Sequence, residues 1–364
     1  ANGRKHIETA PSVTDFVARR NELMFKTCAP DPGSFVAKRD FTVGIPSAFS
    51  IHTLNPLYSW FFHTLGIKTI RSDGVEHEGV ARVESNYCFP AEIAHGAVQN
   101  IVNKGVDYIF VPHFRDMPSY EKNVHANFCP ITQGLPYYLK KAFPEVHEKK
   151  WLPLVVSFKY GKTKALQFFL ELGARLGIDA EETTAAFHLA YDKQKEYFEK
   201  ARELGKEALE TARNSSNPAI VLFGRPYNAF TQEANMGIPR KFTSRGYTIV
   251  PFDILPFEDE DIFSNMYWYY GQQNMKATSL LAKEPNLYVA YISNFSCAPD
   301  SFMLHYVKWL MGTKPFLILE LDSHTADAGI DTRVEAFLDI IEGYNSKKSE
   351  LTTDRYDNGL RFIN

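Results

Sequence analysis

The sequence contains little cysteine and no long apolar run. Only 4 of its 364 residues are cysteines, and no two of them form a Cys-x-x-Cys pair. So few cysteines in a chain of this length do not make a disulfide framework, which leaves metal binding or redox chemistry as their special use. No apolar run reaches the length of a membrane span and no signal peptide is visible. We therefore expect no membrane association and a cytoplasmic location.

Charge of either sign is not in large excess either. The chain carries 40 Lys and Arg residues against 43 Asp and Glu residues, for a net charge of −3, and the two signs are interspersed. A protein that binds nucleic acid usually concentrates basic residues on one face, so we expect no nucleic-acid partner. The hydrophobic content of 45% is that of a globular protein, and the length allows two or more domains.

What the sequence does have is a series of apolar, β-branched runs that alternate with helical patterns. Such alternation predicts parallel sheets with helices on both faces. We expect an α/β protein with two Rossmann- or flavodoxin-like lobes, joined by a helical segment and separated by a cleft between their strand ends. Gly-Ile-Pro occurs in both lobes, at Gly44 and Gly237, which indicates an internal duplication. The predicted divisions are an N-terminal extension at 1–40, a first lobe at 41–160, a helical linker at 161–215, a second lobe at 216–343 and a tail at 344–364.

Helices are expected wherever apolar residues recur with a period of 3.6. The stretch at 181–212 is charged on one side, which predicts a long surface helix between the lobes. The other expected helices lie at 14–25, 91–103, 136–143, 163–176, 259–282 and 332–341.

Three of the cysteines follow predicted strands and precede predicted helices. Cys297 comes after the buried run 287–292, while Cys88 and Cys129 follow strands of the first lobe. Open α/β sheets bind ligands at the carboxyl ends of their strands, and a helix N-terminus favours the thiolate form of a cysteine. Each of the three has a proline within two residues, and Cys-Pro is familiar from iron–sulfur ligation. Cys28 also precedes a proline but lies in a turn-rich linker, where we interpret it as a spare thiol.

The residues alone leave three interpretations of these thiols open. Three thiolates do not complete a tetrahedral zinc site, so zinc needs a histidine as well. A cubane iron–sulfur cluster held by three cysteines leaves one iron open to water or substrate. The third interpretation is three separate buried thiols that behave as small apolar side chains. The histidines considered as a fourth zinc ligand are His95, His113, His125 and His305.

Five motifs resemble the 2-hydroxyacyl-CoA dehydratase and benzoyl-CoA reductase superfamily, and in particular its activase-associated branch, the CoA-substrate-specific enzyme activase proteins. The resemblance extends from about Phe41 to Tyr344. The nucleotide-binding activase module that usually accompanies this branch is absent from the sequence. The motifs are Ser-Asn-Tyr-Cys-Phe-Pro-Ala-Glu-Ile-Ala-His-Gly at 85–96, Gly-Val-Asp-Tyr-Ile-Phe-Val-Pro at 105–112, Phe-Gly-Arg-Pro-Tyr-Asn at 223–228, Ser-Asn-Phe-Ser-Cys-Ala-Pro-Asp-Ser-Phe at 293–302 and Glu-Leu-Asp-Ser-His-Thr-Ala-Asp-Ala-Gly at 320–329.

This resemblance implies a cofactor and a partner. It implies a [4Fe-4S]-type cluster bound by Cys88, Cys129 and Cys297, with low-potential electrons supplied by an ATP-hydrolysing activator that carries its own iron–sulfur cluster. Some relatives hold a double-cubane cluster through six cysteines, which this chain supplies only if a dimer shares the cluster. The implied function is the dehydratase- or reductase-like component of such a system, with a small-molecule or acyl-CoA substrate.

Several polar residues near the motifs are weaker candidates for a catalytic role or for a role in supporting the cofactor. His95 follows Cys88 by two helical turns, and Arg225 and Asn228 follow the first strand of the second lobe. We expect these two to orient an anionic substrate or to pair with an acidic residue, Glu233 or Asp253. Other expected roles are acid–base chemistry for His324 and Asp327, hydrogen bonds to cluster sulfur for Asn294 and Ser296, and helix capping for Asp300. The alternatives to an enzyme are a non-catalytic electron-relay or scaffold domain and a structural zinc protein.

Overall fold

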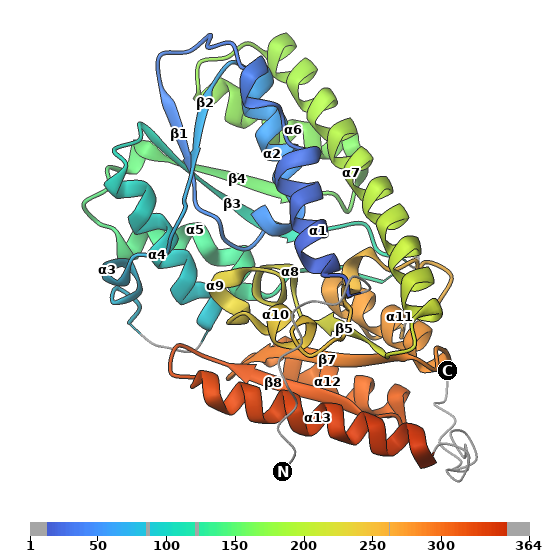
Figure 1. Cartoon of the computed structure of the whole chain (residues 1–364). Helices are drawn as coiled ribbons and strands as arrows, with labels where there is room; N and C mark the ends of the chain where they lie inside the picture. The colour runs from blue at the N-terminus through green and yellow to red at the C-terminus, as the bar shows by residue number, and fades with distance from the viewer. Residues whose placement is uncertain (1–12, 85–87, 121–123, 262, 348–364) are drawn as a thin grey trace.

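The computed structural model has two lobes, each built on a four-stranded sheet (Figure 1). The residues it describes are 13–84, 88–120, 124–261 and 263–347. In the first sheet every pair of neighbouring strands is parallel, in the order β2-β1-β3-β4. These strands are β1 (Thr42–Ile45), β2 (Lys68–Arg71), β3 (Tyr108–Asp116) and β4 (Trp151–Ser157).

The second sheet is also parallel throughout and has the order β6-β5-β7-β8. This is the order of the first sheet repeated four strands later, as a duplication would produce. Its central strands β5 and β7 are buried along their whole length, because helices cover both faces. The α/β fold class with two parallel-sheet lobes is therefore confirmed. The strands are β5 (Ala219–Phe223), β6 (Ile249–Pro251), β7 (Leu287–Asn294) and β8 (Phe316–Leu321).

Helices surround both sheets, and most lie close to where the sequence predicts them. Those of the first lobe are α2 (Ile51–Thr64), α3 (His77–Val80), α4 (Phe89–Asn103), α5 (Pro130–Ala142) and α6 (Gly161–Arg175), with a 3-10 turn at Glu148–Lys150. Those of the second lobe are α8 (Pro226–Ala229), α9 (Gln232–Asn235), α10 (Ile238–Thr243), α11 (Tyr269–Lys283), α12 (Ala298–Met311) and α13 (Asp327–Lys347), with the 3-10 turn η4 at Phe252–Ile254.

Three of these helices have different bounds from those expected. Residues 259–261 and 263–268 are not helical. Asn127 forms backbone hydrogen bonds with Tyr267 and Tyr269 on either side of Trp268, which hold Trp268 extended, so the helix begins only at Tyr269. Helix α5 begins six residues early, directly after Cys129, since Pro130 is well suited to a first helical position. Helix α13 begins five residues early and continues to Lys347.

Two segments connect the lobes. The expected long helix is present as α7 (Ala180–Asn214), which packs against α2 and α6 on one lobe and η4 on the other. The second connection is α1 (Phe16–Glu22), followed by a π-helical turn at Leu23–Thr27 and a 3-10 turn at Pro32–Ser34. Although α1 precedes the first lobe in sequence, Phe16 and Val17 belong to the core of the second lobe. Residues 1–12 and 348–364, which fall in the predicted extension and tail, lie outside the described residues.

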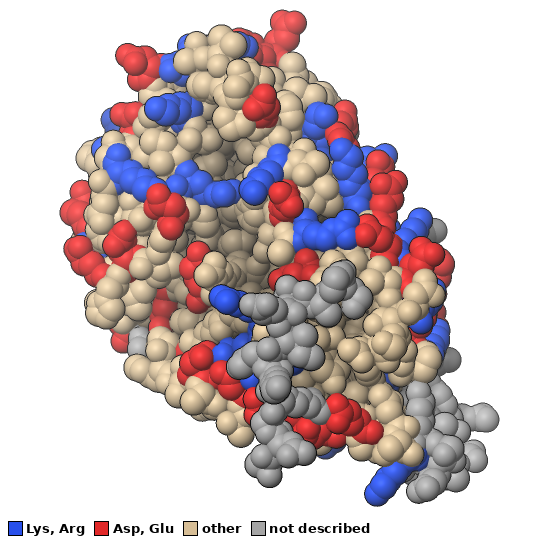
Figure 2. All heavy atoms as spheres, in the orientation of Figure 1, with Lys and Arg blue, Asp and Glu red and all other residues tan. Residues whose placement is uncertain are grey.

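Figure 2 shows that basic and acidic residues mix over most of one face, with a row of basic residues across the first lobe and a hollow below it. This face therefore has no large area of a single sign. In the part of the chain that the structure describes, no helix is both long enough and apolar enough to span a bilayer.

His52, in α2 between the lobes, gives a testable pH dependence. Burial lowers the pKa of His52 to about 3 from its usual 6.5, and the nearby charges of Arg20 and Arg71 act in the same direction against a hydrogen bond to the Ser47 carbonyl. The unfolded chain thus binds a proton between pH 6.5 and 3 that the folded chain does not. Stability contributed by neutral His52 is complete above pH 6.5 and is lost as the pH falls, by about 2 kcal/mol at pH 5.

Urea unfolding at pH 8 and pH 5 checks this expectation. A His52→Gln variant should lose about 2 kcal/mol less than the parent chain between the two pH values. The control is His77→Gln, on the exposed side of α3, which should behave like the parent. Equal losses in His52→Gln and the parent would contradict the prediction.

Candidate functional site between the two lobes

The three cysteines singled out in the sequence each occupy the N-cap of a helix. Cys88 precedes α4, Cys129 precedes α5 and Cys297 precedes α12, and in every case a proline fills the first or second helical position. The Cys129 sulfur accepts a hydrogen bond from the backbone N–H of Thr132, at 3.4 Å. This local structure follows from the sequence, because proline cannot continue a strand but starts a helix readily. Residues 85–87 of the motif before Cys88 lie outside the described residues.

The fold brings thiols of both lobes together. Burial raises the pKa of Cys88 to about 11 and that of Cys297 still further, and the charge of Cys129 acts on both in the same direction, to a smaller extent. The helix N-termini therefore do not make these two groups thiolates by themselves, contrary to expectation. A bound metal would deprotonate them outright.

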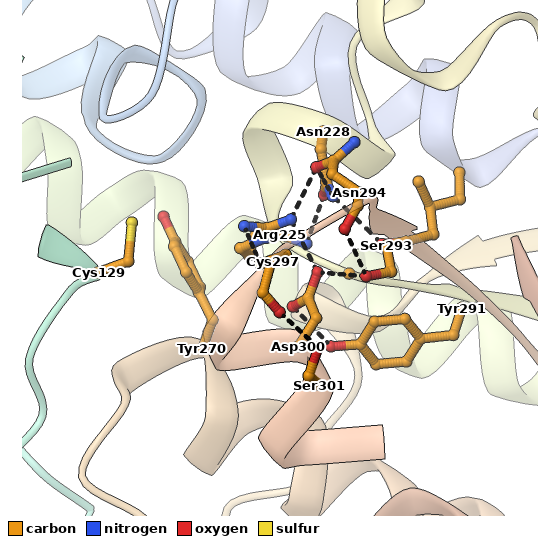
Figure 3. A network of polar contacts seen from close by, with 12 residues as sticks. Cys129, Arg225, Asn228, Tyr270, Tyr291, Ser293, Asn294, Cys297, Asp300 and Ser301 are labelled. Atoms are coloured by element: carbon orange, nitrogen blue, oxygen red, sulfur yellow. Dashed lines mark hydrogen bonds and ion pairs between the residues drawn. The ribbon is translucent and has the colours of Figure 1, made fainter. Parts of the chain in front are cut away.

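Arg225 occupies the centre of this site (Figure 3). It caps α8, and its guanidinium donates to the Cys297 sulfur at 3.0 Å, to Asn294 Oδ1 at 2.8 Å and to Asp300 Oδ2 at 2.8 Å. Burial alone would lower the pKa of Arg225, but Asp300 and Cys297 raise it well above its usual value. Its Nε is buried and has no hydrogen-bond partner among the described residues.

Asp300 belongs to this network, and the expectation that it caps α12 was wrong. Cys297 takes the cap position, while Asp300 lies inside the helix with its side chain fully buried. Besides Arg225, its carboxylate accepts hydrogen bonds from Ser293 at 3.0 Å and Tyr291 at 3.1 Å. The carboxylate is thereby satisfied, which is what a buried charge requires.

The proposed acidic partners of Arg225 were also wrong. Asp253 pairs with Arg20 of α1 instead, at 2.8 Å. Asn228 turns inward and accepts from the Arg225 backbone N–H at 2.7 Å, so it does not face a substrate. Asn294 is likewise occupied by hydrogen bonds from Arg225 and Asn228 and by its own bond to the Leu321 carbonyl.

Two tyrosines that the sequence did not identify lie near Cys129. The Tyr227 hydroxyl lies 3.9 Å from the Cys129 sulfur, and the Tyr227 ring stacks below the Arg225 guanidinium at 5.3 Å. Tyr270 of α11 also interacts electrostatically with Cys129, and its hydroxyl lies 2.7 Å from Thr53. The Arg-Pro-Tyr sequence after β5 was the only available signal, because nothing in the spacing of Tyr270 relates it to a cysteine.

The histidines that the sequence offered as candidates do not gather around the thiols among the described residues. His95 is buried in α4, where its Nδ1 lies 2.7 Å from the Ala91 carbonyl and its ring stacks on Phe143. His324 lies exposed in the turn after β8, and Asp327 pairs with Lys241. Among the described residues, neither His324 nor Asp327 forms a hydrogen bond or ion pair with the three cysteines, and their acid–base role stays a prediction. Other ring nitrogens are engaged as well, His113 with the Gln133 carbonyl and His125 with Lys159.

A family comparison matches residues 42–255 of this chain to the CoA enzyme activase uncharacterised domain (DUF2229). The chain belongs to this family. The matched segment holds Cys88, Cys129 and Arg225, while Cys297 lies beyond it. Membership in this activase domain family agrees with the activase-associated branch of the resemblance. A comparison with curated proteins gives no match.

Solved structures resemble this activase-family chain only distantly. Glucosamine-6-phosphate deaminase from Thermotoga maritima has 11% identity and a TM-score of 0.22, with 92% of this chain and 93% of that chain covered. Zn(II)-bound AdcA from Streptococcus pneumoniae has 10% identity and a TM-score of 0.23, with coverage of 86% and 57%. The C-terminal domain of glucosamine-fructose-6-phosphate aminotransferase from Francisella tularensis has 10% identity and a TM-score of 0.23, with coverage of 90% and 93%.

The described residues of this activase-family chain do not form a site for a single metal ion. Within the described ranges, no three His, Cys, Asp or Glu side chains are grouped so that they could hold one metal ion. A cubane cluster does not need such a group, since each thiolate binds a different iron. The unpartnered Nε of Arg225 adds a buried donor at the same place, of the kind that hydrogen-bonds cluster sulfur.

Proposed function

We propose that this chain is an iron–sulfur protein, the dehydratase- or reductase-like component of an activase-dependent enzyme system. It takes low-potential electrons from an ATP-hydrolysing activator that has its own cluster, and it reduces a small-molecule or acyl-CoA substrate. One observation carries the proposal: three cysteines, drawn from both lobes, occupy helix N-caps, and one of them, Cys297, accepts a hydrogen bond from a buried arginine that has a donor to spare. Membership in the activase domain family supports the context.

Cys88, Cys129 and Cys297 are the residues that would hold a [4Fe-4S] cluster. When bound, such a cluster supplies single-electron transfer, and with three protein ligands it leaves one iron open. A double-cubane cluster would require six cysteines and therefore a dimer in which two chains share it.

The other residues of the site position the cysteine ligands or surround them. Arg225 donates a hydrogen bond to the Cys297 sulfur, and Asp300 fixes the guanidinium through a pair that is almost completely buried. The rings of Tyr227 and Tyr270 are buried close to Cys129. The Arg225 guanidinium, which donates to the Cys297 sulfur, favours the thiolate form of that ligand once a metal is present.

The test is the metal content of protein purified without oxygen. We expect about four irons and four acid-labile sulfides per chain, with the broad visible absorption of an iron–sulfur protein. A Cys297→Ala variant should lose them. The matched control is Cys28→Ala, because Cys28 is buried in the core of the second lobe and follows the π-helical turn, away from the three helix caps; it should keep its iron.

Two outcomes would overturn the proposal. Zinc in place of iron would indicate a structural zinc protein, and no metal in strictly anaerobic protein would leave only the fold. A third outcome would change only the enzymatic part of the proposal. If the protein contains iron but, once reduced, does not reduce any substrate, the chain is a relay or scaffold domain and not an enzyme.

A further inference from the structure

A cavity of about 190 Å³ lies between the lobes, enclosed by α1, α2, α7, α8, α11 and η4. It is distinct from the thiol site but adjoins it, because Tyr270 lines the cavity and also interacts with Cys129. An apolar cavity of about 150 Å³ is large enough for benzene. The volume here therefore suits a molecule slightly larger than benzene and excludes one as large as coenzyme A.

The charges around the cavity are already neutralised. Arg20, on one wall, forms an ion pair with Asp253 at 2.8 Å. Arg202, on another wall, forms an ion pair with Glu258 at 2.5 Å and donates to the Leu255 carbonyl. Because both guanidinium groups are paired, the cavity offers no free charge to a charged ligand, whose desolvation would be uncompensated.

Aromatic rings form much of the wall. The rings of Tyr120 and Tyr269 are nearly parallel, at 12° with centroids 6.4 Å apart, and Gln273 donates to both hydroxyls at 3.0 Å. Phe198 and Tyr270 contribute further ring surface. Flat aromatic walls of this kind pack best against a planar ligand.

Two polar groups of the wall have an atom without a hydrogen-bond partner among the described residues. Tyr197 is 2% exposed and lines the cavity, but no hydrogen bond among the described residues involves its hydroxyl. Neighbouring Asp253 has a buried Oδ1 that also lacks a partner. Burial raises the pKa of Tyr197, so the phenol group stays protonated and is available to donate or accept. A ligand in the cavity would give these two groups the partners that buried polar groups normally have.

We propose that this cavity binds a small, uncharged, planar molecule that carries one hydroxyl or amide group. The ligand stacks on the tyrosine rings and hydrogen-bonds the Tyr197 hydroxyl. This binding site goes beyond the proposed function and does not depend on a cluster.

Phenol is the probe, and its binding to the full chain is measured by calorimetry and ligand-observed NMR. We expect saturable binding with a Kd on the order of 1 mM, as for a seven-atom ligand of ordinary efficiency. Benzene, which lacks the hydroxyl, should bind more weakly, and benzoate, which is charged, should not bind. The measurement needs neither activator nor electrons and is made with and without metal, so its failure is separate from failure of the proposed function.

Two variants locate the binding. Tyr197→Phe keeps the ring but removes the hydroxyl, so it should weaken phenol binding about fivefold and leave benzene binding unchanged. Ala201→Leu, on the α7 wall, fills the cavity and should abolish binding of both. Tyr160→Phe, on an exposed tyrosine, is the matched control and should bind phenol normally. Absence of saturable phenol binding to the parent chain, or binding that neither variant changes, would overturn the proposal.

Discussion

Replacement of Asp300 by alanine is expected to lower the free energy of unfolding by about 3–5 kcal/mol, because it leaves the Arg225 guanidinium as a buried charge without its counter-ion. The side chains of the pair are 4% and 0% exposed, so water cannot take the place of the lost carboxylate. Ser293 and Tyr291 also lose the acceptor for their hydroxyl groups. Urea unfolding, with the metal content of each protein matched, gives the difference directly.

A second variant separates the buried charge from the loss of packing. Arg225→Met combined with Asp300→Leu removes both charges and should recover at least half of the stability, since apolar replacement of a whole buried pair is often neutral. The surface control is Asp327→Ala, which breaks an ion pair with Lys241 on an aspartate that is 72% exposed and should cost at most about 1 kcal/mol. A cost for Asp300→Ala as small as that of the control would show that the network does not stabilise the fold.

The second large effect on the free energy of unfolding is expected from replacement of Gly205, which lies inside α7. In an exposed helix, alanine is more stable than glycine by about 1 kcal/mol, so Gly→Ala normally stabilises. Here the sign should reverse, because a Cβ at Gly205 would lie 1.8 Å from the Ile254 carbonyl oxygen and 2.6 Å from its carbon. The backbone of η4 must move away from α7 to make room. We expect Gly205→Ala to lower the free energy of unfolding by about 1–3 kcal/mol.

Gly343 provides the matched control for this prediction. It also lies inside a long helix, α13, but a Cβ there would meet nothing within 4 Å. Gly343→Ala should therefore raise stability by up to about 1 kcal/mol while Gly205→Ala lowers it. Changes of the same sign at the two glycines in thermal or urea unfolding would contradict the close approach of α7 and η4.

Much of the fold was accessible from the sequence because its signals are local. The buried run that forms β7 and the periodic pattern that forms α7 each specify an element without reference to the rest of the chain. The helix that the sequence predicts from 259 begins only at Tyr269, and this error comes from a contact that is distant in the sequence. An aromatic-rich stretch is compatible with a helix, and only Asn127, more than 130 residues earlier, keeps its end extended.

The site could be predicted only in part, for the same reason. Cysteine followed by proline marks a helix start, so the positions of Cys88, Cys129 and Cys297 could be predicted one by one. Which side chains surround them depends on the packing of two lobes. The pairing of Arg225 with Asp300 crosses 75 residues, and both are typical surface residue types, so no sequence pattern identifies them as a buried pair.

The position of α1 has a consequence for the order in which the chain folds. Thr14 hydrogen-bonds to Thr248, 234 residues away, and Asp15 pairs with Ile249 at the edge of the second sheet. During synthesis the first lobe can therefore be complete before the core that Phe16 and Val17 join has formed. Contacts of such long sequence separation form slowly, because a long loop must close before they stabilise anything. Docking of the beginning of the chain onto β6 is thus a late step of folding, and until then Phe16 and the apolar edge that it covers are open to aggregation.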